Sequence, residues 1–85
     1  MSRVEIYTKS FCPFCTRAKQ LLDAKGVDYQ EYRIDSQPEL RAPMIERANG
    51  GYTVPQIFIN DQHIGGCDEM IALETQGTLD KLLAA

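Results

Sequence analysis

Three cysteines carry the reactive groups of this sequence: two stand three residues apart at positions 12 and 15, and the third stands alone at position 67. Residues at positions i and i+3 of a helix have Cβ atoms roughly 5–6 Å apart, whereas a disulfide needs about 3.5–4.5 Å. A modest adjustment therefore lets Cys12 and Cys15 form a reversible disulfide. Thiol–disulfide exchange needs such a pair, in which one thiolate attacks a substrate disulfide and the second thiol resolves the product.

The residues next to Cys12 favour its ionised form. Pro13 suits the first turn of a helix, because its missing N–H would have no partner there. Cys12 would then lie at the positive end of the helix dipole, beside unpaired N–H groups that stabilise a thiolate. Lys9 and Arg17 add positive charge nearby. We therefore expect Cys12 to be the nucleophile and Cys15 to be the resolving thiol.

Two other uses of the cysteines stay open at this point. The first is a pair of reduced thiols that lie in a helix without any chemistry. The second is a zinc site with three cysteine ligands and one histidine, which would consist of Cys12, Cys15, Cys67 and His63. Small zinc sites usually bring their ligands as two knuckles, whereas a Gly-Gly turn separates His63 from Cys67. The pattern therefore favours redox chemistry without a metal, and it favours His63 as a partly exposed strand residue.

Composition excludes several other classes of protein. The chain has 85 residues, enough for one domain and too few for two. Its formal charge of −3 argues against a general nucleic-acid binder, which presents a basic face. No apolar run approaches the roughly 20 residues of a membrane span, and the first residues lack the pattern of a signal peptide. We expect a complete, cytoplasmic, monomeric protein with one domain over residues 1–85 and with no nucleic-acid or membrane partner.

The first half of the chain alternates between strand and helix patterns. Residues 4–7 alternate and are β-prone, which predicts a buried strand followed by a loop over residues 8–11. The helix that starts at the cysteines should end at Gly26, because glycine suits the left-handed residue that terminates a helix. Residues 27–34 predict a second strand, which should run parallel to the first after a right-handed crossover.

A second helix follows these strands. Residues 36–39 (SQPE) have the spacing of a capping box and predict the start of this helix. Pro43 either bends the helix or marks the residue where the main helix restarts after a short first turn. Residues 49–51 (NGG) should end the segment.

Two short strands, a third helix and a last short turn complete the pattern. Residues 56–60 predict a strand, residues 60–61 a turn, and residues 63–64 a short partner strand. A third helix should run to residue 76 with Asp68 and Glu69 in its first turn, where carboxylates are favoured. Residues 79–83 predict a final short amphipathic turn. The expected fold class is α/β, in the order β-α-β-α-β-β-α, with helices on both faces of a four-stranded mixed sheet.

Three motifs together resemble the glutaredoxin family, and the resemblance covers nearly the whole chain. Residues 7–9 (YTK) and 12–15 (CPFC) resemble the first strand and the active-site motif of the family, which is commonly CPYC. Residues 53–58 (TVPQIF) match its TVP segment, and residues 65–69 (GGCDE) resemble its GGxD loop. The resemblance is strongest to the short bacterial dithiol glutaredoxins. It implies a thioredoxin fold, glutathione as co-substrate and a cis peptide bond before Pro55.

The resemblance also implies which residues hold the glutathione tripeptide. Thr53 and Val54 would bind its backbone as a short β-addition, with Pro55 fixing the turn. Lys9 would pair with the glycine carboxylate of glutathione. Phe14, which replaces the more usual tyrosine of the motif, would supply a stacking surface.

The γ-glutamyl end of glutathione would lie at the start of the third helix. Gly66, Cys67 and Asp68 would receive it, with backbone N–H groups for its carboxylate and the Asp68 side chain for its ammonium. Glu69 is a weaker candidate for the same ammonium. Cys67 would contribute backbone only, and we expect its thiol to be inert.

The implied activity is the reduction of glutathione mixed disulfides and of protein disulfides through Cys12 and Cys15. The expected partners are glutathione and disulfide-containing or glutathionylated proteins, with ribonucleotide reductase as one such substrate in some relatives. Two other functions stay open. One is a thioredoxin-like protein reduced by a flavoprotein reductase, and the other is a dimer that carries a glutathione-ligated [2Fe–2S] cluster.

Overall fold

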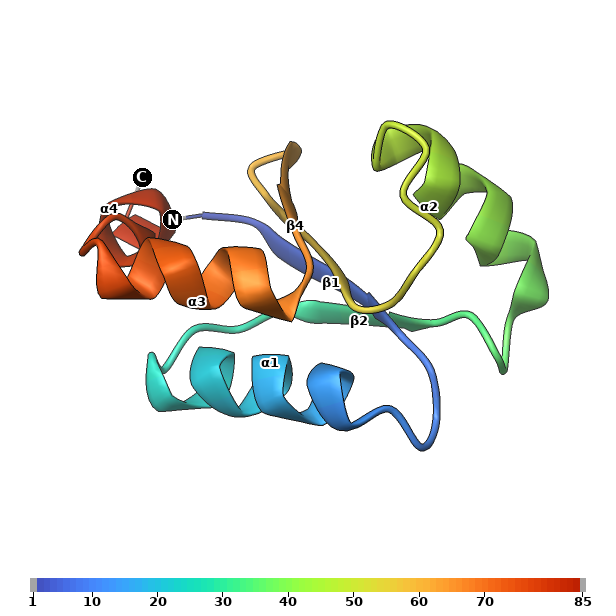
Figure 1. Cartoon of the computed structure of the whole chain (residues 1–85), viewed down its shortest axis with the longest axis horizontal. Helices are drawn as coiled ribbons and strands as arrows, with labels where there is room; N and C mark the ends of the chain where they lie inside the picture. The colour runs from blue at the N-terminus through green and yellow to red at the C-terminus, as the bar shows by residue number, and fades with distance from the viewer. Residues whose placement is uncertain (1, 85) are drawn as a thin grey trace.

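The computed structural model describes residues 2–84, with a four-stranded sheet at the centre (Figure 1). The strands are β1 (Val4–Thr8), β2 (Gln30–Arg33), β3 (Gln56–Ile59) and β4 (Gln62–Gly65). They lie in the order β2-β1-β3-β4. β1 is parallel to β2 and antiparallel to β3, and β4 is antiparallel to β3. The mixed sheet predicted from the sequence is confirmed.

Helices cover both faces of this sheet. One face carries α1 (Pro13–Ala24), α3 (Cys67–Thr75) and α4 (Leu79–Ala84). The other face carries the 3₁₀ turn η1 (Pro38–Leu40) and α2 (Arg41–Arg47). Figure 1 shows α1 and α3 side by side, with α2 at the opposite end of the view. No helix within residues 2–84 is long and apolar enough to cross a membrane.

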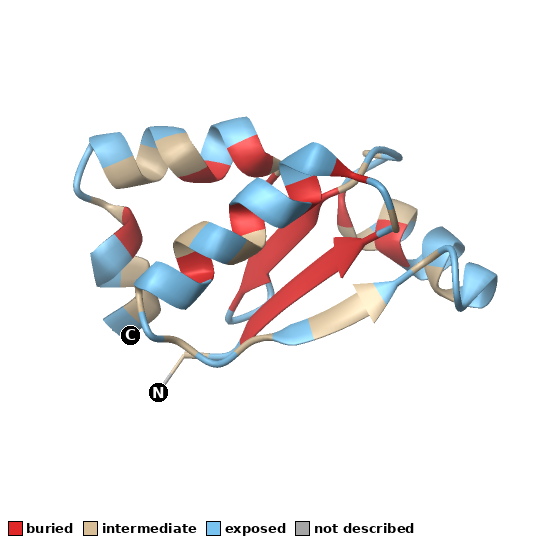
Figure 2. Ribbon diagram, turned by 90° about the horizontal axis from the view of Figure 1, so that it is seen from below, coloured by how far each residue is buried: buried red, intermediate tan, exposed pale blue. Residues whose placement is uncertain are grey.

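Alternation along the strands divides the core into two clusters, because successive side chains of a strand point to opposite faces. On β1, Ile6 packs beneath α1 and α3, while Tyr7 packs beneath α2. On β3, Ile57 and Phe58 divide between the two faces in the same way. Both central strands are buried along their length, whereas the edge strand β2 is half-buried or exposed (Figure 2).

The second strand is shorter than predicted, because β2 begins at Gln30 and not at residue 27. Val27 and Tyr29 pack, partly buried, against the cluster under α1 and α3. Their alternation therefore reflects the packing of the connection after α1. Pairing with β1 starts where Gln30 lies opposite Glu5.

The capping box predicted over residues 36–39 is wrong. Ser36 lies in a turn after β2, and η1 is preceded by Gln37, whose side chain makes no capping hydrogen bond. The backbone N–H of Gln37 donates to the carbonyl oxygen of Arg33 at 3.0 Å, which closes that turn. A backbone hydrogen bond thus closes the turn, whereas the sequence pattern predicted a capping hydrogen bond with the side chain of Ser36.

Two other boundaries differ by one or two residues. One of the two expected arrangements is observed, because a short first turn precedes the main helix. The main helix begins at Arg41, however, and not at Pro43. Pro43 then lies in the first turn of α2, where its missing N–H costs little. β3 ends at Ile59, because Asn60 and Asp61 adopt φ values of 52° and 65° and form the tight turn to β4.

Candidate functional site

Cys12 lies at the N-terminus of α1, where the loop after β1 ends. It is the N-cap residue of α1, with Pro13 in the first turn as expected. A disulfide joins Cys12 to Cys15, and their Cα atoms are 5.2 Å apart. Cys15 is only 1% exposed, whereas Cys12 is 9% exposed. Cys12 is therefore the more accessible of the two sulfurs to a substrate disulfide.

The sulfur of Cys12 is surrounded by backbone groups. The backbone N–H of Cys15 donates to the Cys12 sulfur at 3.2 Å, which caps the helix. On the opposite side, the carbonyl oxygen of Val54 lies 3.9 Å from the same sulfur. A thiolate formed at Cys12 would retain the N–H donor and the positive end of the helix dipole, and both favour the anion.

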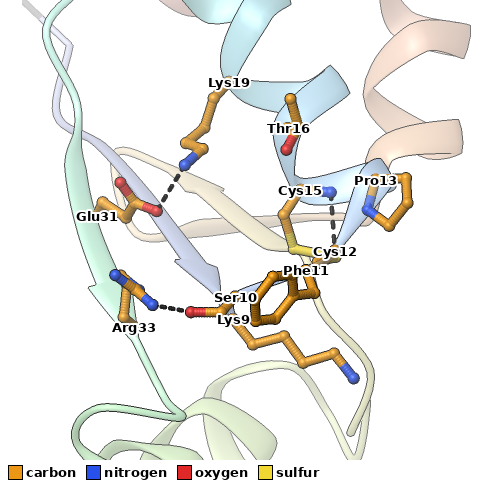
Figure 3. Close-up of a pocket in the computed structure, with 10 residues that line it drawn as sticks. All are labelled: Lys9, Ser10, Phe11, Cys12, Pro13, Cys15, Thr16, Lys19, Glu31 and Arg33. Carbon is orange, nitrogen blue, oxygen red and sulfur yellow. Dashed lines mark hydrogen bonds and ion pairs between the residues drawn. A yellow bond between two sulfur atoms is a disulfide. The ribbon is translucent and has the colours of Figure 1, made fainter.

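One groove opens beside the disulfide, between α1, the loop after β1 and β2 (Figure 3). Its volume is about 680 Å³, and its wall includes the exposed side chains of Lys9 and Phe11. No sequence pattern predicted this groove, because the side chains that β2 contributes to it are polar and resemble those of an exposed edge strand. The full lining is Lys9, Ser10, Phe11, Cys12, Pro13, Cys15, Thr16, Lys19, Glu31 and Arg33.

Most charges in this groove are already paired. Lys19 donates to Glu31 at 3.0 Å, and the hydroxyl of Thr8 donates to the same carboxylate at 2.7 Å. Burial raises the pKa of Glu31, but these two hydrogen bonds together with the positive charges of Lys19 and Arg33 lower the pKa below its ordinary value. Arg33 donates to the Ser10 hydroxyl (Figure 3). Lys9 is exposed and makes no ion pair among residues 2–84.

A second groove brings together almost all the residues predicted to bind glutathione. It has a volume of about 310 Å³ and lies between the first turn of α1, the bend before β3 and the start of α3. The peptide bond between Val54 and Pro55 is cis, as expected from the resemblance. Lys9 is the exception, because it lines the first groove. The second groove is lined by Phe14, Thr53, Val54, Pro55, Gly66, Cys67, Asp68 and Glu69.

The start of α3 presents backbone groups to this groove. Gly66 is the N-cap, and its N–H donates to the Glu69 carboxylate at 2.6 Å. Glu69 is therefore engaged by its own helix, which leaves Asp68 as the uncommitted carboxylate of this first turn. Gly65 has a φ of 114°, and a Cβ there would lie 2.9 Å from the Glu69 carboxylate, so only glycine fits.

Cys67 lies under the second groove and is only 4% exposed. Burial raises the pKa of its thiol, although the positive charge of Arg17 partly opposes the rise. The positive charge of Arg17 thus acts on the Cys67 thiol, and its expected support of a Cys12 thiolate stays a prediction. A buried thiol with a raised pKa is unreactive, which agrees with the expected inert role.

His63 has a partner other than a metal. It lies partly buried on β4, as predicted, and its Nε2 is 2.7 Å from the side-chain oxygen of Gln56. Within the described residues, no three His, Cys, Asp or Glu side chains are placed to share a metal ion. Sequence reasoning treated Gln56 only as the first residue of a strand and missed this contact.

Comparisons with known proteins agree with this geometry. Residues 4–64 match the family model of glutaredoxin. The chain is 58% identical to glutaredoxin 3 of Escherichia coli K12, over 98% of this chain and 99% of that protein. It is 56% identical to a glutaredoxin of Pseudomonas aeruginosa over 100% of both chains. A buckwheat glutaredoxin, solved as a complex with glutathione, superposes with a TM-score of 0.88 at 31% identity, over 98% of this chain and 77% of that one.

These matches extend along nearly the whole chain, and the folds of the structural neighbours agree with the four-stranded mixed sheet and its flanking helices. The CPFC motif of the sequence forms the disulfide of the structure, at the start of α1. The chain therefore has the thioredoxin fold and belongs to the glutaredoxin family of thiol–disulfide oxidoreductases.

Proposed function

We propose that this protein is a glutathione-dependent oxidoreductase that reduces glutathione mixed disulfides and protein disulfides. One observation carries the proposal: the second groove holds every predicted glutathione-binding residue except Lys9. The groove opens beside Cys12, whose sulfur is 3.9 Å from the carbonyl oxygen of Val54. A tripeptide bound along Val54 would bring its own sulfur to the nucleophile. The complex of buckwheat glutaredoxin with glutathione supports the same ligand.

Glutathione would bind mainly through backbone groups. The free N–H and C=O of Val54 would pair with the extended tripeptide as a short β-addition. The N–H groups at the start of α3 would receive the γ-glutamyl carboxylate, and Asp68 would receive its ammonium. Phe14 is 56% exposed and would cover one side of the ligand. Lys9 would meet the glycine carboxylate where glutathione extends past Cys12 toward the first groove.

Reduction of a mixed disulfide would need only Cys12. Its thiolate attacks the glutathione sulfur of the mixed disulfide, a new S–S bond forms to glutathione, and the substrate leaves as a thiolate that takes up a proton. A second glutathione thiolate then attacks the glutathione sulfur bound to Cys12. Oxidised glutathione leaves, and the Cys12 thiolate is restored.

Reduction of a protein disulfide would use both cysteines. Cys12 attacks one sulfur of the substrate and releases the other as a thiol. Cys15 then attacks Cys12, which releases the second substrate thiol and forms the Cys12–Cys15 disulfide. Two glutathione molecules reduce this disulfide in turn and leave as oxidised glutathione. Protein substrates such as ribonucleotide reductase, a monomeric state and a cytoplasmic location belong to the same proposal.

Serine substitutions at the two cysteines test this function. In an assay coupled to glutathione reductase and NADPH, Cys12→Ser should abolish turnover of both a small glutathione mixed disulfide and a protein disulfide. Cys15→Ser should retain turnover of the mixed disulfide and lose reduction of the protein disulfide, because only the second reaction needs a resolving thiol.

Two outcomes contradict the proposal. If Cys15→Ser loses both reactions equally, the route through Cys12 alone is wrong. If the wild-type protein turns over only with a flavoprotein thioredoxin reductase and not with glutathione, the co-substrate is wrong.

A further inference from the structure

Gln56 is a buried polar side chain in a strand that is otherwise apolar. It is 5% exposed at the start of β3, and burial of an amide is costly unless its donors and acceptor are paired. Both ends of this amide have partners: Nε2 donates to the carbonyl oxygen of Thr53 at 2.9 Å, and Oε1 lies 2.7 Å from Nε2 of His63. The amide thus joins β4 to the bend that lines the second groove.

The orientation of this amide follows from its partners. The Thr53 carbonyl can only accept a hydrogen bond, so the Gln56 nitrogen must face it and the Gln56 oxygen must face His63. His63 is therefore the donor through Nε2–H. The ring of His63 packs against Phe58, with 5.2 Å between ring centroids, which limits its rotation.

Val54 packs, partly buried, against the cluster under α2, but the backbone of the bend over residues 52–55 has few hydrogen bonds. Outside the helices and strands of residues 2–84, no backbone–backbone hydrogen bond involves Thr53 or Val54. Gly51 lets the chain close over the amide, because a Cβ at this position would lie 3.0 Å from the nitrogen of Gln56. The amide therefore fills the inside of the bend and ties its carbonyl group to the sheet.

We infer that Gln56, held by His63, is a positioning residue for glutathione. The pair fixes the Thr53 carbonyl and so orients the backbone of Val54 toward the second groove and the Cys12 sulfur. The inference rests on the proposed function and extends it to two residues that line neither groove. Because the pair touches no reacting atom, its loss should weaken binding of the tripeptide and leave the chemical step intact.

Steady-state kinetics with a small glutathione mixed disulfide test the inference. Gln56→Leu keeps the size of the side chain and removes both hydrogen bonds. We expect its KM to rise about five- to tenfold, the effect of one lost buried hydrogen bond, with kcat within twofold of wild type. His63→Leu should behave in the same way. His63→Gln, which supplies another N–H donor, should restore most of the KM.

A control variant separates positioning from general loss of stability. Tyr32→Phe removes a hydrogen bond of 2.9 Å to Glu5 at β2, the edge strand opposite β4 in the sheet, and touches neither groove. It should lower Tm without changing KM. The NMR order parameters of the backbone N–H groups of Thr53 and Val54 should be lower in Gln56→Leu than in wild type and unchanged in Tyr32→Phe.

Different outcomes contradict the positioning role of Gln56 and the glutathione-dependent activity. An active wild-type protein whose KM is unchanged by Gln56→Leu overturns the inference alone, whatever the variant does to stability. A wild-type protein that does not turn over the mixed disulfide overturns the proposed function, and the inference fails with it.

Discussion

Phe11 combines two unfavourable features directly before Cys12. Its side chain is fully exposed, and its φ is 55°, in the left-handed region that costs a non-glycine residue roughly 1–2 kcal/mol. Phe14, two residues after Cys12, is also exposed but lies within α1 and has no such conformation. The two aromatic side chains on either side of the nucleophile thus carry different conformational costs.

Phe11→Asn should stabilise the protein. Asparagine tolerates the left-handed conformation, and an exposed aromatic ring loses little buried surface when it is removed. We expect the free energy of unfolding to rise by up to about 1 kcal/mol, equivalent to roughly 4–8 °C in Tm for a domain of this size. Thermal denaturation of Phe14→Asn, which should show no gain, is the control. An unchanged or lower Tm for Phe11→Asn would contradict this reading of the strain.

A buried ion pair joins α2 to the sheet. Glu5 on β1 is 2% exposed, and Arg47, the last residue of α2, donates to its two oxygens at 2.9 and 3.2 Å. Tyr32 donates to the same carboxylate at 2.9 Å. The hydrogen bond from Arg47 outweighs burial and lowers the pKa of Glu5 below its ordinary value of 4.5. The guanidinium group also lies 4.1 Å from the ring centre of Phe58. α2 is therefore held by charge as well as by apolar contact.

Arg47→Met should destabilise the protein at neutral pH, because it leaves the buried Glu5 carboxylate with only the exposed Arg3, at 3.5 Å, as a cationic partner. Breaking a buried pair in this way costs on the order of 3 kcal/mol. In a Glu5→Gln background the same substitution should cost clearly less. Because the folded-state pKa of Glu5 is lowered, the stabilisation is present above the ordinary pKa and is lost as pH falls through the folded pKa.

Urea denaturation at pH 7 and pH 3 checks this prediction. The difference in unfolding free energy between wild type and Arg47→Met should shrink at the lower pH, because the stabilisation is lost as pH falls toward and through the lowered folded-state pKa of Glu5. A cost that is equal in the two backgrounds would show that Arg47 stabilises α2 through packing alone.

The two ends of the described chain meet on the face of the sheet that carries α1 and α3. The hydroxyl of Ser2 donates to the carbonyl oxygen of Leu83 at 2.7 Å. Lys25, at the C-terminal end of α1, pairs with Glu74 at 2.7 Å and with Asp80 at 2.8 Å. These contacts connect α1, α3 and α4 at the end of the molecule away from the cysteines (Figure 1).

Leu79 places α4 in the main core. It is 0% exposed, whereas Leu83 on the same helix is only partly buried. Leu79→Ala should therefore lower the free energy of unfolding by about 2–5 kcal/mol, as for other buried leucines, and Leu83→Ala should cost less. The kcat at a temperature where both variants are folded should be unchanged, because neither residue lines the two grooves. Urea denaturation measures both changes. Equal decreases in the free energy of unfolding for the two variants would show that Leu79 contributes no more to the core than Leu83 does.

Features that depend on neighbours in the chain are determined by the sequence itself. Cys12 and Cys15 are brought together by the geometry of one helical turn, and Pro13 places that turn at the start of α1. The strand and helix order follows from the hydrophobic period, and the tight turn at Asn60 follows from residues that tolerate positive φ. The single-domain organisation stays a prediction of chain length.

Features that depend on distant residues were decided only by the tertiary structure. Glu5 and Arg47 are 42 positions apart, and nothing in the sequence indicates that the fold buries Glu5 and places the half-buried Arg47 against it. Gln56 and His63 likewise carry no local pattern for their hydrogen bond. Lys9 lies in a different groove from Thr53, because the disulfide stands between the two openings. Local rules set the backbone, but the partner of a buried polar group depends on which faces come together, and no short stretch of sequence contains that information.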